Sequence, residues 1–229
     1  MTLKLDKVSL FRYTDTLLSL DEEINSGEVL SIMGPSGSGK STLLNAIAGQ
    51  LTAPFSMTGS IYINNTCING MPAHNRGVGV LYQDPLLFEH MTVGQNIAFA
   101  LPSNAPSNAP SKASIHNAPS KKTLSKAQRE QRVTEMLAEV GLSDLQHRPV
   151  QTLSGGQQAR IALLRTLAAA PNVVLLDEPF SKLDAATKTQ MRTWVFSQLK
   201  ARGLPTLLVT HDSEDVEAAQ GHLIEIETC

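Results

Sequence analysis

One short stretch, residues 34–41, constrains the fold of this chain more than any other. It lies between an apolar run at residues 29–33 and a helix-like segment at residues 42–49, and it matches the pattern G-x-x-x-x-G-K-[ST]. A strand before the loop and a helix after it are the context that a phosphate-binding loop requires. Its glycines let successive backbone N–H groups face an anion, and the start of the helix adds a positive partial charge. The stretch predicts an α/β fold whose phosphate site is formed by Gly34, Pro35, Ser36, Gly37, Ser38, Gly39, Lys40, Ser41 and Thr42.

The end of this loop carries two chemical roles. Lys40 is expected to reach the β- and γ-phosphates of a nucleotide, and the hydroxyl of Ser41 is expected to hold Mg²⁺. A Gly/Ser turn that merely caps a helix is the alternative for such a stretch. The apolar strand before it and the helix after it disfavour that alternative.

The composition is that of an ordinary soluble globular protein. The chain has 229 residues, of which 41% are hydrophobic and 17% charged, and its net charge is −2. This balance gives no basic field, so nothing in it argues for nucleic-acid binding. Cys67 and Cys229 lack the spacing of a zinc site or a disulfide framework. The chain shows neither a signal peptide nor 18 uninterrupted apolar residues, so we expect a cytoplasmic protein that serves a membrane only by docking to another protein.

A second candidate site follows the apolar run at residues 173–176. Asp177 and Glu178 come directly after it. Such a run is typical of a central parallel strand, and ligands bind at the carboxyl ends of these strands. We expect Asp177 to hold Mg²⁺ and Glu178 to polarise the attacking water as general base. Two adjacent carboxylates in an ordinary loop are the alternative.

Helix-start patterns recur along the second half of the chain. Ser125 with Gln128 and Ser154 with Gln157 form capping boxes, and Asp184 is placed to cap a third helix. Ser154, Gly155, Gly156 and Gln157 allow two interpretations. They either start a helix and do nothing more, or they form a second, exposed anion-binding helix terminus.

Three further side chains stand where strands are predicted to end or turn. Gln83 leaves a predicted strand at residues 77–82, and its amide could ligate Mg²⁺ or orient a water. His211 is the one histidine at the carboxyl end of a predicted buried strand, residues 205–210. Phe11 or Tyr13 could stack on a nucleotide base, although a packed or exposed strand aromatic is as good an interpretation of each.

The stretch at residues 102–122 departs from this pattern. Asn-Ala-Pro-Ser occurs there three times in a run dominated by Ser, Pro, Asn, Ala and Lys. Such a composition has almost nothing to bury. We interpret it as a flexible surface insertion, with either a docking role or no role.

Taken in order, these motifs resemble the complete motif set of the ATP-binding subunits of ABC transporters. Residues 34–41, Gln83, residues 153–157, residues 173–178, residues 181–184 and His211 carry the resemblance. It implies one ATP-binding domain over residues 1–229, with a mostly parallel central sheet. Residues 1–83 and 151–229 are expected to form an N-terminal antiparallel β-subdomain and a RecA-like core, and residues 84–150 an inserted α-helical subdomain. Lys182 departs from the alanine common at its position.

The resemblance also implies a mechanism and partners. Two copies would form a head-to-tail homodimer, with two ATP molecules each held between one phosphate loop and the partner's residues 154–157, near Asp184. Glu178 and His211 would be catalytic, Ser41, Gln83 and Asp177 would hold Mg²⁺, and Tyr13 is the favoured base-stacking aromatic.

Residues after Gln83, namely Phe88, Thr92, Val93 and Asn96, look like the bacterial importer branch that includes thiamine, spermidine and ferric-ion systems. We therefore expect an integral membrane permease and a solute-binding protein as partners, no nucleic acid, and a peripheral location on the cytoplasmic face of the inner membrane. An exporter ATPase and a soluble ABC ATPase acting on ribosomes or DNA are the alternatives. A P-loop kinase would have no use for residues 153–157.

Overall fold

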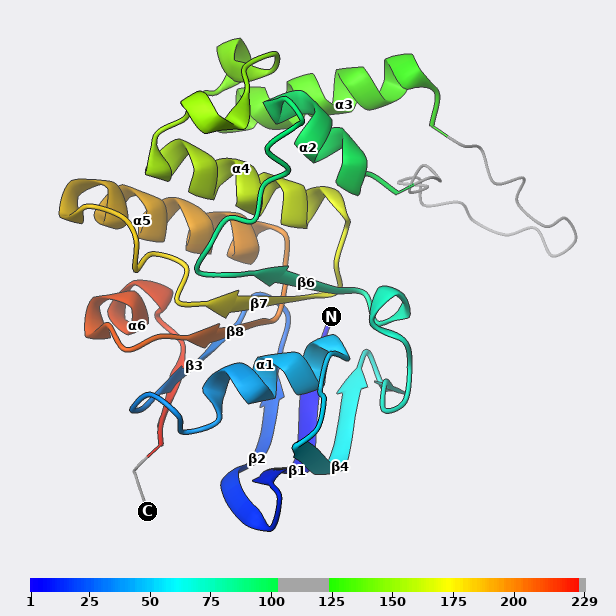
Figure 1. The fold of residues 1–229 in the computed structure, drawn as a ribbon, viewed down its shortest axis with the longest axis vertical. Helices are drawn as coiled ribbons and strands as arrows, with labels where there is room; N and C mark the ends of the chain where they lie inside the picture. The colour runs from blue at the N-terminus through cyan, green and yellow to red at the C-terminus, as the bar shows by residue number, and fades with distance from the viewer. Residues whose placement is uncertain (103–123, 227–229) are drawn as a thin grey trace, which may run out of the picture.

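The computed structural model describes residues 1–102 and 124–226, which form two sheets and a set of helices (Figure 1). The low-complexity insertion predicted at residues 102–122 lies outside the described residues, apart from Pro102. The first sheet is antiparallel, with strand order β2-β1-β4-β5. Its strands are β1 (Leu3–Arg12), β2 (Asp15–Ile24), β4 (Phe55–Ile63) and β5 (Thr66–Cys67).

The second sheet has strand order β6-β7-β8-β3-β9, and all its pairs are parallel. Its strands are β6 (Val78–Leu81), β7 (Val173–Asp177), β8 (Thr206–Val209), β3 (Val29–Met33) and β9 (His222–Glu225). The first four residues of β3 and of β7, and all of β8, are buried. A strand covered on both faces is mostly apolar, so these runs lack the polar alternation of β1, although Ser31 and Thr206 are also buried in them.

Helices cover both faces of the parallel sheet. α1 (Lys40–Ala48) lies on one face, beside the antiparallel sheet, whereas α4 (Gly155–Ala168) and α5 (Ala185–Ala201) lie on the other (Figure 1). Separate buried clusters form on the two faces, one including Ile32 and Ile47 and the other Leu176 and Val195. α6 (Ser213–Ala219) follows β8 and packs against α5. This is the α/β architecture with an N-terminal antiparallel sheet that the sequence predicts.

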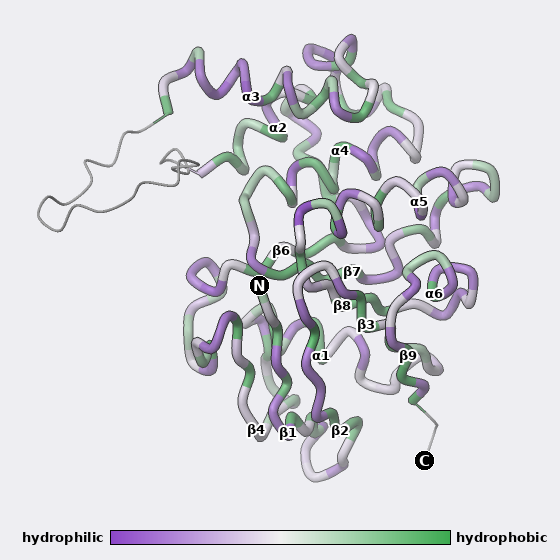
Figure 2. Tube along the Cα trace, turned by 180° about the vertical axis from the view of Figure 1, so that it is seen from behind, coloured by the Kyte–Doolittle hydropathy of each residue, from purple (hydrophilic) through white to green (hydrophobic). Residues whose placement is uncertain are grey.

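A further helical layer packs on α4. α2 (Val93–Ala100) and α3 (Lys126–Glu139) share a buried cluster with α4 that includes Ile97, Leu137 and Ile161. Figure 2 shows polar and apolar residues alternating along these helices, as expected where one face is buried. The predicted limits of this subdomain, residues 84 and 150, stay a prediction. Of the described helices, none has the length and apolarity needed to cross a bilayer.

The local signals of the sequence are confirmed in several places. The capping boxes at Ser125 and Ser154 are both present, and Asp184 caps α5 by accepting from the backbone N–H of Thr187 at 3.1 Å. The sequence interpretation omitted α2, α6 and β9. β9 joins the sheet edge beside β3 and begins at the exposed His222.

Candidate functional site

The phosphate loop connects the carboxyl end of β3 to the start of α1. Gly37 and Gly39 have φ angles of 86° and 92°, which glycine adopts without a steric penalty. A side chain at Gly39 would in addition meet Leu17 at 3.0 Å. The loop therefore needs glycine at this position for both conformation and space.

The Lys40 ammonium turns back into this loop. It donates to the carbonyl oxygens of Gly34 and Pro35 at 2.8 and 2.6 Å and contacts the Ser38 hydroxyl at 3.3 Å. Burial lowers the pKa of Lys40, while the charges of Glu178 and Asp177 act in the opposite direction. Lys40 is thus a cation held inside the loop, where it can meet phosphate oxygens.

Asp177 ends β7 beside the loop. Burial and the adjacent Glu178 raise the pKa of its carboxyl group, whereas the charge of Lys40 and a hydrogen bond from Ser41 lower it. Ser41 and Asp177 offer a hydroxyl and a carboxylate, both oxygen ligands of the kind that Mg²⁺ prefers. These two residues fit the Mg²⁺ role predicted for them.

Glu178 has an unusual backbone conformation. Its φ angle is 45°, a left-handed conformation that is strained for glutamate and concentrated at functional sites. Its N–H donates to the carbonyl of Val209 in β8 at 2.9 Å, and its own carbonyl accepts from the Ser181 hydroxyl at 2.9 Å. Two neighbouring segments therefore hold the strained residue in place.

The Glu178 side chain meets the predicted histidine. Nδ1 of His211 lies 3.1 Å from Oε1 of Glu178, and the His211 side chain is 66% exposed. Because Asp177 pairs with Val209 in the parallel register of β7 and β8, the residues that follow these two strands meet at the same edge. The structure thus brings Glu178 and His211 together beside the phosphate loop.

A cavity of 320 Å³ opens over the loop. It is lined by Ser36, Gly37, Gly39, Lys40, Ser41, Thr42, Glu178, Arg12, Leu17 and Phe55. The last three come from the antiparallel sheet and were not predicted, and Phe55 carries no local signal beyond its position at the start of a strand. A larger cavity of 840 Å³ includes Val29 and Leu30 at the amino end of β3, the opposite end from the phosphate loop.

Tyr13 lies outside the lining of the 320 Å³ cavity. It sits in the turn between β1 and β2 with a φ angle of 56°, and it is 74% exposed. Its N–H donates to the carbonyl of Pro54, so Tyr13 is a backbone neighbour of Phe55. Phe11 remains within β1, so the two aromatic residues do not share one strand face.

Gln83, the start of α4 and Asp184 do not line this cavity. Gln83 is exposed just beyond β6, and Ser154 and Gly155 are exposed at the start of α4. Figure 1 shows α4 and α1 on opposite faces of the parallel sheet. Asp184 is exposed at the start of α5. Beside Gln83, Asp84 forms an ion pair with Lys182.

Gly156 is explained by packing within the chain. A side chain there would meet Cγ2 of Thr187 at 2.5 Å, so the start of α4 approaches the first turn of α5 closely. The capping box of Ser154 and Gln157 also has a structural role. Neither observation identifies an anionic partner for the exposed start of α4 within the described part of the same chain.

A P-loop with a buried lysine, facing two carboxylates at the end of a parallel strand, defines a P-loop nucleotide hydrolase. A family model described as ABC transporter matches residues 17–181. The chain belongs to the ABC transporter family, as an ATP-binding domain whose homologues are ATPases.

Individual relatives support this membership. The chain is 41% identical over 202 residues to the uncharacterized ABC transporter ATP-binding protein YnjD of Escherichia coli, a match that covers 88% of this chain and 84% of that protein. It is 38% identical over 216 residues to the sulfate/thiosulfate import ATP-binding protein CysA of Vibrio cholerae, covering 94% of this chain and 53% of the relative. The chain spans about half the length of the sulfate/thiosulfate relatives that it matches.

Among solved structures, the fold is similar to that of cbiO1 from Clostridium perfringens, part of the ABC transporter complex cbiONQ. The TM-score is 0.75 and the sequence identity 26%, with 97% of this chain and 83% of that chain covered. The similarity extends over both sheets and the helices, and is not limited to the phosphate loop.

Proposed function

We propose that this chain is the ATP-hydrolysing subunit of an importer for a small solute, peripheral on the cytoplasmic face of the inner membrane. One observation carries the proposal: Glu178, in a strained conformation, lines the same cavity as the phosphate loop and contacts His211. The relatives named for sulfate and thiosulfate import support the import direction.

The chemistry of the proposed reaction follows from the positions of these groups. The phosphate loop and Lys40 bind the β- and γ-phosphates, and Ser41 and Asp177 would hold Mg²⁺, which would supply positive charge to the reacting phosphate. Glu178 accepts the proton of the attacking water as general base. His211, which contacts Glu178, would also reach the terminal phosphate, and Gln83, which follows β6, would serve as a further Mg²⁺ ligand.

Two copies of the chain complete the proposed site. The exposed, glycine-rich start of α4 offers free N–H groups that a phosphate would satisfy. In a two-fold dimer, each α4 start would face the partner's phosphate loop, and both would be satisfied at once. Loss of the γ-phosphate then removes the charge that holds the two copies together.

Exposed apolar side chains on the α2 region support a membrane partner. Phe99 is 64% exposed and packs edge-on against Phe88, and Leu86 is 58% exposed. Arg165 of α4 stacks over the Phe88 ring at 5.5 Å and donates to the carbonyl of Leu86. We propose that this surface receives the permease, with a solute-binding protein completing the complex.

Replacing Phe99 with glutamate tests this surface. We expect Phe99→Glu to abolish co-purification with the proposed membrane permease, because a charge would have to be desolvated at an apolar contact. The ATPase rate of the purified chain should stay within about twofold, since α2 does not line the 320 Å³ cavity. Glu130→Gln, on the exposed face of α3, is the control. Unchanged co-purification would show that this surface is not where the permease binds. Co-purification of ribosomes or DNA alone would rule out the proposed transport function.

A pair of substitutions identifies the aromatic residue that contacts the base. Base stacking on an aromatic ring contributes about 1–3 kcal/mol, which is about 5- to 150-fold in affinity. We propose Tyr13 for this role, which requires its turn to fold over the cavity, whereas Phe55 already lines it. Tyr13→Ala should weaken binding of a fluorescent ATP analogue, and Phe55→Ala should change it less. The reverse order would transfer the role to Phe55.

A further inference from the structure

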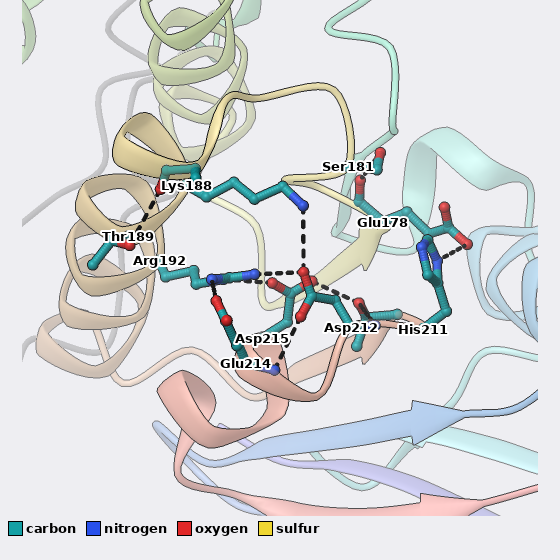
Figure 3. Close-up of polar contacts among 11 residues, drawn as sticks. Glu178, Ser181, Lys188, Thr189, Arg192, His211, Asp212, Glu214 and Asp215 are labelled. Atoms are coloured by element: carbon teal, nitrogen blue, oxygen red, sulfur yellow. Dashed lines mark hydrogen bonds and ion pairs between the residues drawn. The ribbon is translucent and has the colours of Figure 1, made fainter.

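An arginine of α5 joins the two residues that flank His211. Arg192 is only 5% exposed, and its guanidinium contacts three carboxylates, those of Asp212, Glu214 and Asp215 (Figure 3). Nη2 lies 2.6 Å from Asp212, and Nε lies 2.6 Å from the buried Asp215. The fixed fork of a guanidinium can hold two carboxylates in one relative geometry, which a single ammonium cannot do.

These contacts reach both sides of His211. Asp212 follows it directly, and Thr210 precedes it and donates its hydroxyl proton to Asp215 at 2.6 Å. The N–H of Asp212 donates to the Thr210 hydroxyl at 3.1 Å. The chain on either side of His211 is therefore connected to the same guanidinium.

Asp212 receives a second cation from the same helix. Nζ of Lys188, one turn before Arg192, lies 3.3 Å from Oδ2 of Asp212. Burial opposes ionisation of Asp212, but the N–H of Glu214, the hydrogen bond from Lys188 and the charge of Arg192 lower its pKa below the ordinary value. Asp212 thus stays an anion between two cations of α5.

The His211 side chain itself has little support. It is 66% exposed, and among the described residues its one recorded polar contact is with Glu178. Glu178 lies at the other end of the loop that leads to Asp184 and into α5. The helix that leaves the Glu178 loop therefore also holds the His211 loop. Figure 3 shows Lys188 and Arg192 of that helix reaching Asp212, and the His211 side chain beside Glu178.

We propose that Lys188 and Arg192, through Asp212, form a clamp that positions His211 against Glu178 for catalysis. This inference rests on the proposed hydrolytic function. Buried ion pairs are weak contributors to stability, since desolvation offsets their attraction, so a positioning role accounts better for three carboxylates around one buried arginine. All three clamp members are positioning residues, because none of them lines the described cavity.

Asp212→Asn tests the clamp without removing the cap of α6. The asparagine oxygen can still accept from the N–H of Glu214, while the charge that Lys188 and Arg192 contact is lost. We expect kcat for ATP to fall about 10-fold with KM unchanged, because a small displacement of a catalytic group costs rate and not binding. Lys188→Met should show the same pattern with a smaller loss, and Lys188→Arg should restore the rate.

The matched control is Glu214→Gln. It removes an equal charge from the same guanidinium, but Glu214 is 72% exposed and does not adjoin His211. We expect its kcat to stay within about twofold of the wild type. An equal loss in Glu214→Gln would show a general effect of charge around Arg192 and would overturn the clamp.

A double-mutant cycle separates the clamp from the proposed function. If Asp212 acts through His211, adding Asp212→Asn to His211→Ala causes no further loss of kcat. Additive losses overturn the clamp while leaving the role of His211 intact. Unchanged turnover in His211→Ala alone would show that His211 is not catalytic, and the clamp would then have no function to support. Thermal unfolding of each variant shows whether a loss of kcat reflects folding.

Discussion

Glu178→Gln is expected to bind ATP normally and to lose turnover by about 10²–10⁴-fold, the range typical for removal of a general base. The substitution keeps the size of the side chain and leaves the phosphate loop and Lys40 unchanged. Steady-state phosphate release and equilibrium binding of a fluorescent ATP analogue measure the two effects separately. Glu135→Gln, on the surface of α3 in an ion pair with Arg132, is the control and should keep the wild-type rate.

The same variant tests the two-copy site. With hydrolysis blocked, saturating Mg·ATP should convert the purified chain to a dimer, because the γ-phosphate that would join the two copies in the proposed dimer is not cleaved. Light scattering coupled to size exclusion measures the mass. Turnover equal to the wild type would assign the base to another residue, and a mass that stays monomeric would contradict the dimer while leaving the base in place.

Lys40→Ala is expected to weaken binding of Mg·ATP by about 10- to 100-fold. A hydrogen bond to a charged group contributes about 1.5–3 kcal/mol, and Lys40 is the cation that the loop encloses. Because Lys40 also satisfies the carbonyls of Gly34 and Pro35, the variant should lose some thermal stability as well.

Lys4→Ala is the matched control for Lys40→Ala. It removes the same charge from a half-exposed lysine at the start of β1, whereas Arg12 at the end of that strand lines the cavity. We expect its affinity for Mg·ATP to equal that of the wild type. Equal weakening in both variants would indicate an effect of net charge, and undiminished affinity in Lys40→Ala would remove the proposed phosphate contact.

Lys40 and Glu178 both lie where the sequence predicts: Lys40 begins α1 directly after the phosphate loop, and Glu178 follows β7. The strand before the loop, the loop glycines and the start of α1 are adjacent in the chain, so one local pattern contains the whole unit. The caps of α3, α4 and α5 are equally local, because a capping side chain meets a backbone N–H two or three residues away. Those starts were predictable for the same reason.

Other features of the site have no local signal. Phe55 and Arg12 reach the cavity because β4 and β1 pair in a register that sets them opposite each other. Neither residue differs in its sequence neighbourhood from an ordinary strand residue. Their position depends on how one sheet packs against the other, which no short pattern records.

The α/β class, the phosphate loop and the carboxylates at the end of β7 were all predictable from the sequence, because each follows from short-range periodicity, glycine content and helix capping. The contact of Glu178 with His211, and that of Arg192 with Asp215, 23 positions away, become visible only in the folded chain. The register of β7 against β8 and the packing of α5 on α6 fix those distances. They arise from contacts between segments that the chain brings together only when it folds.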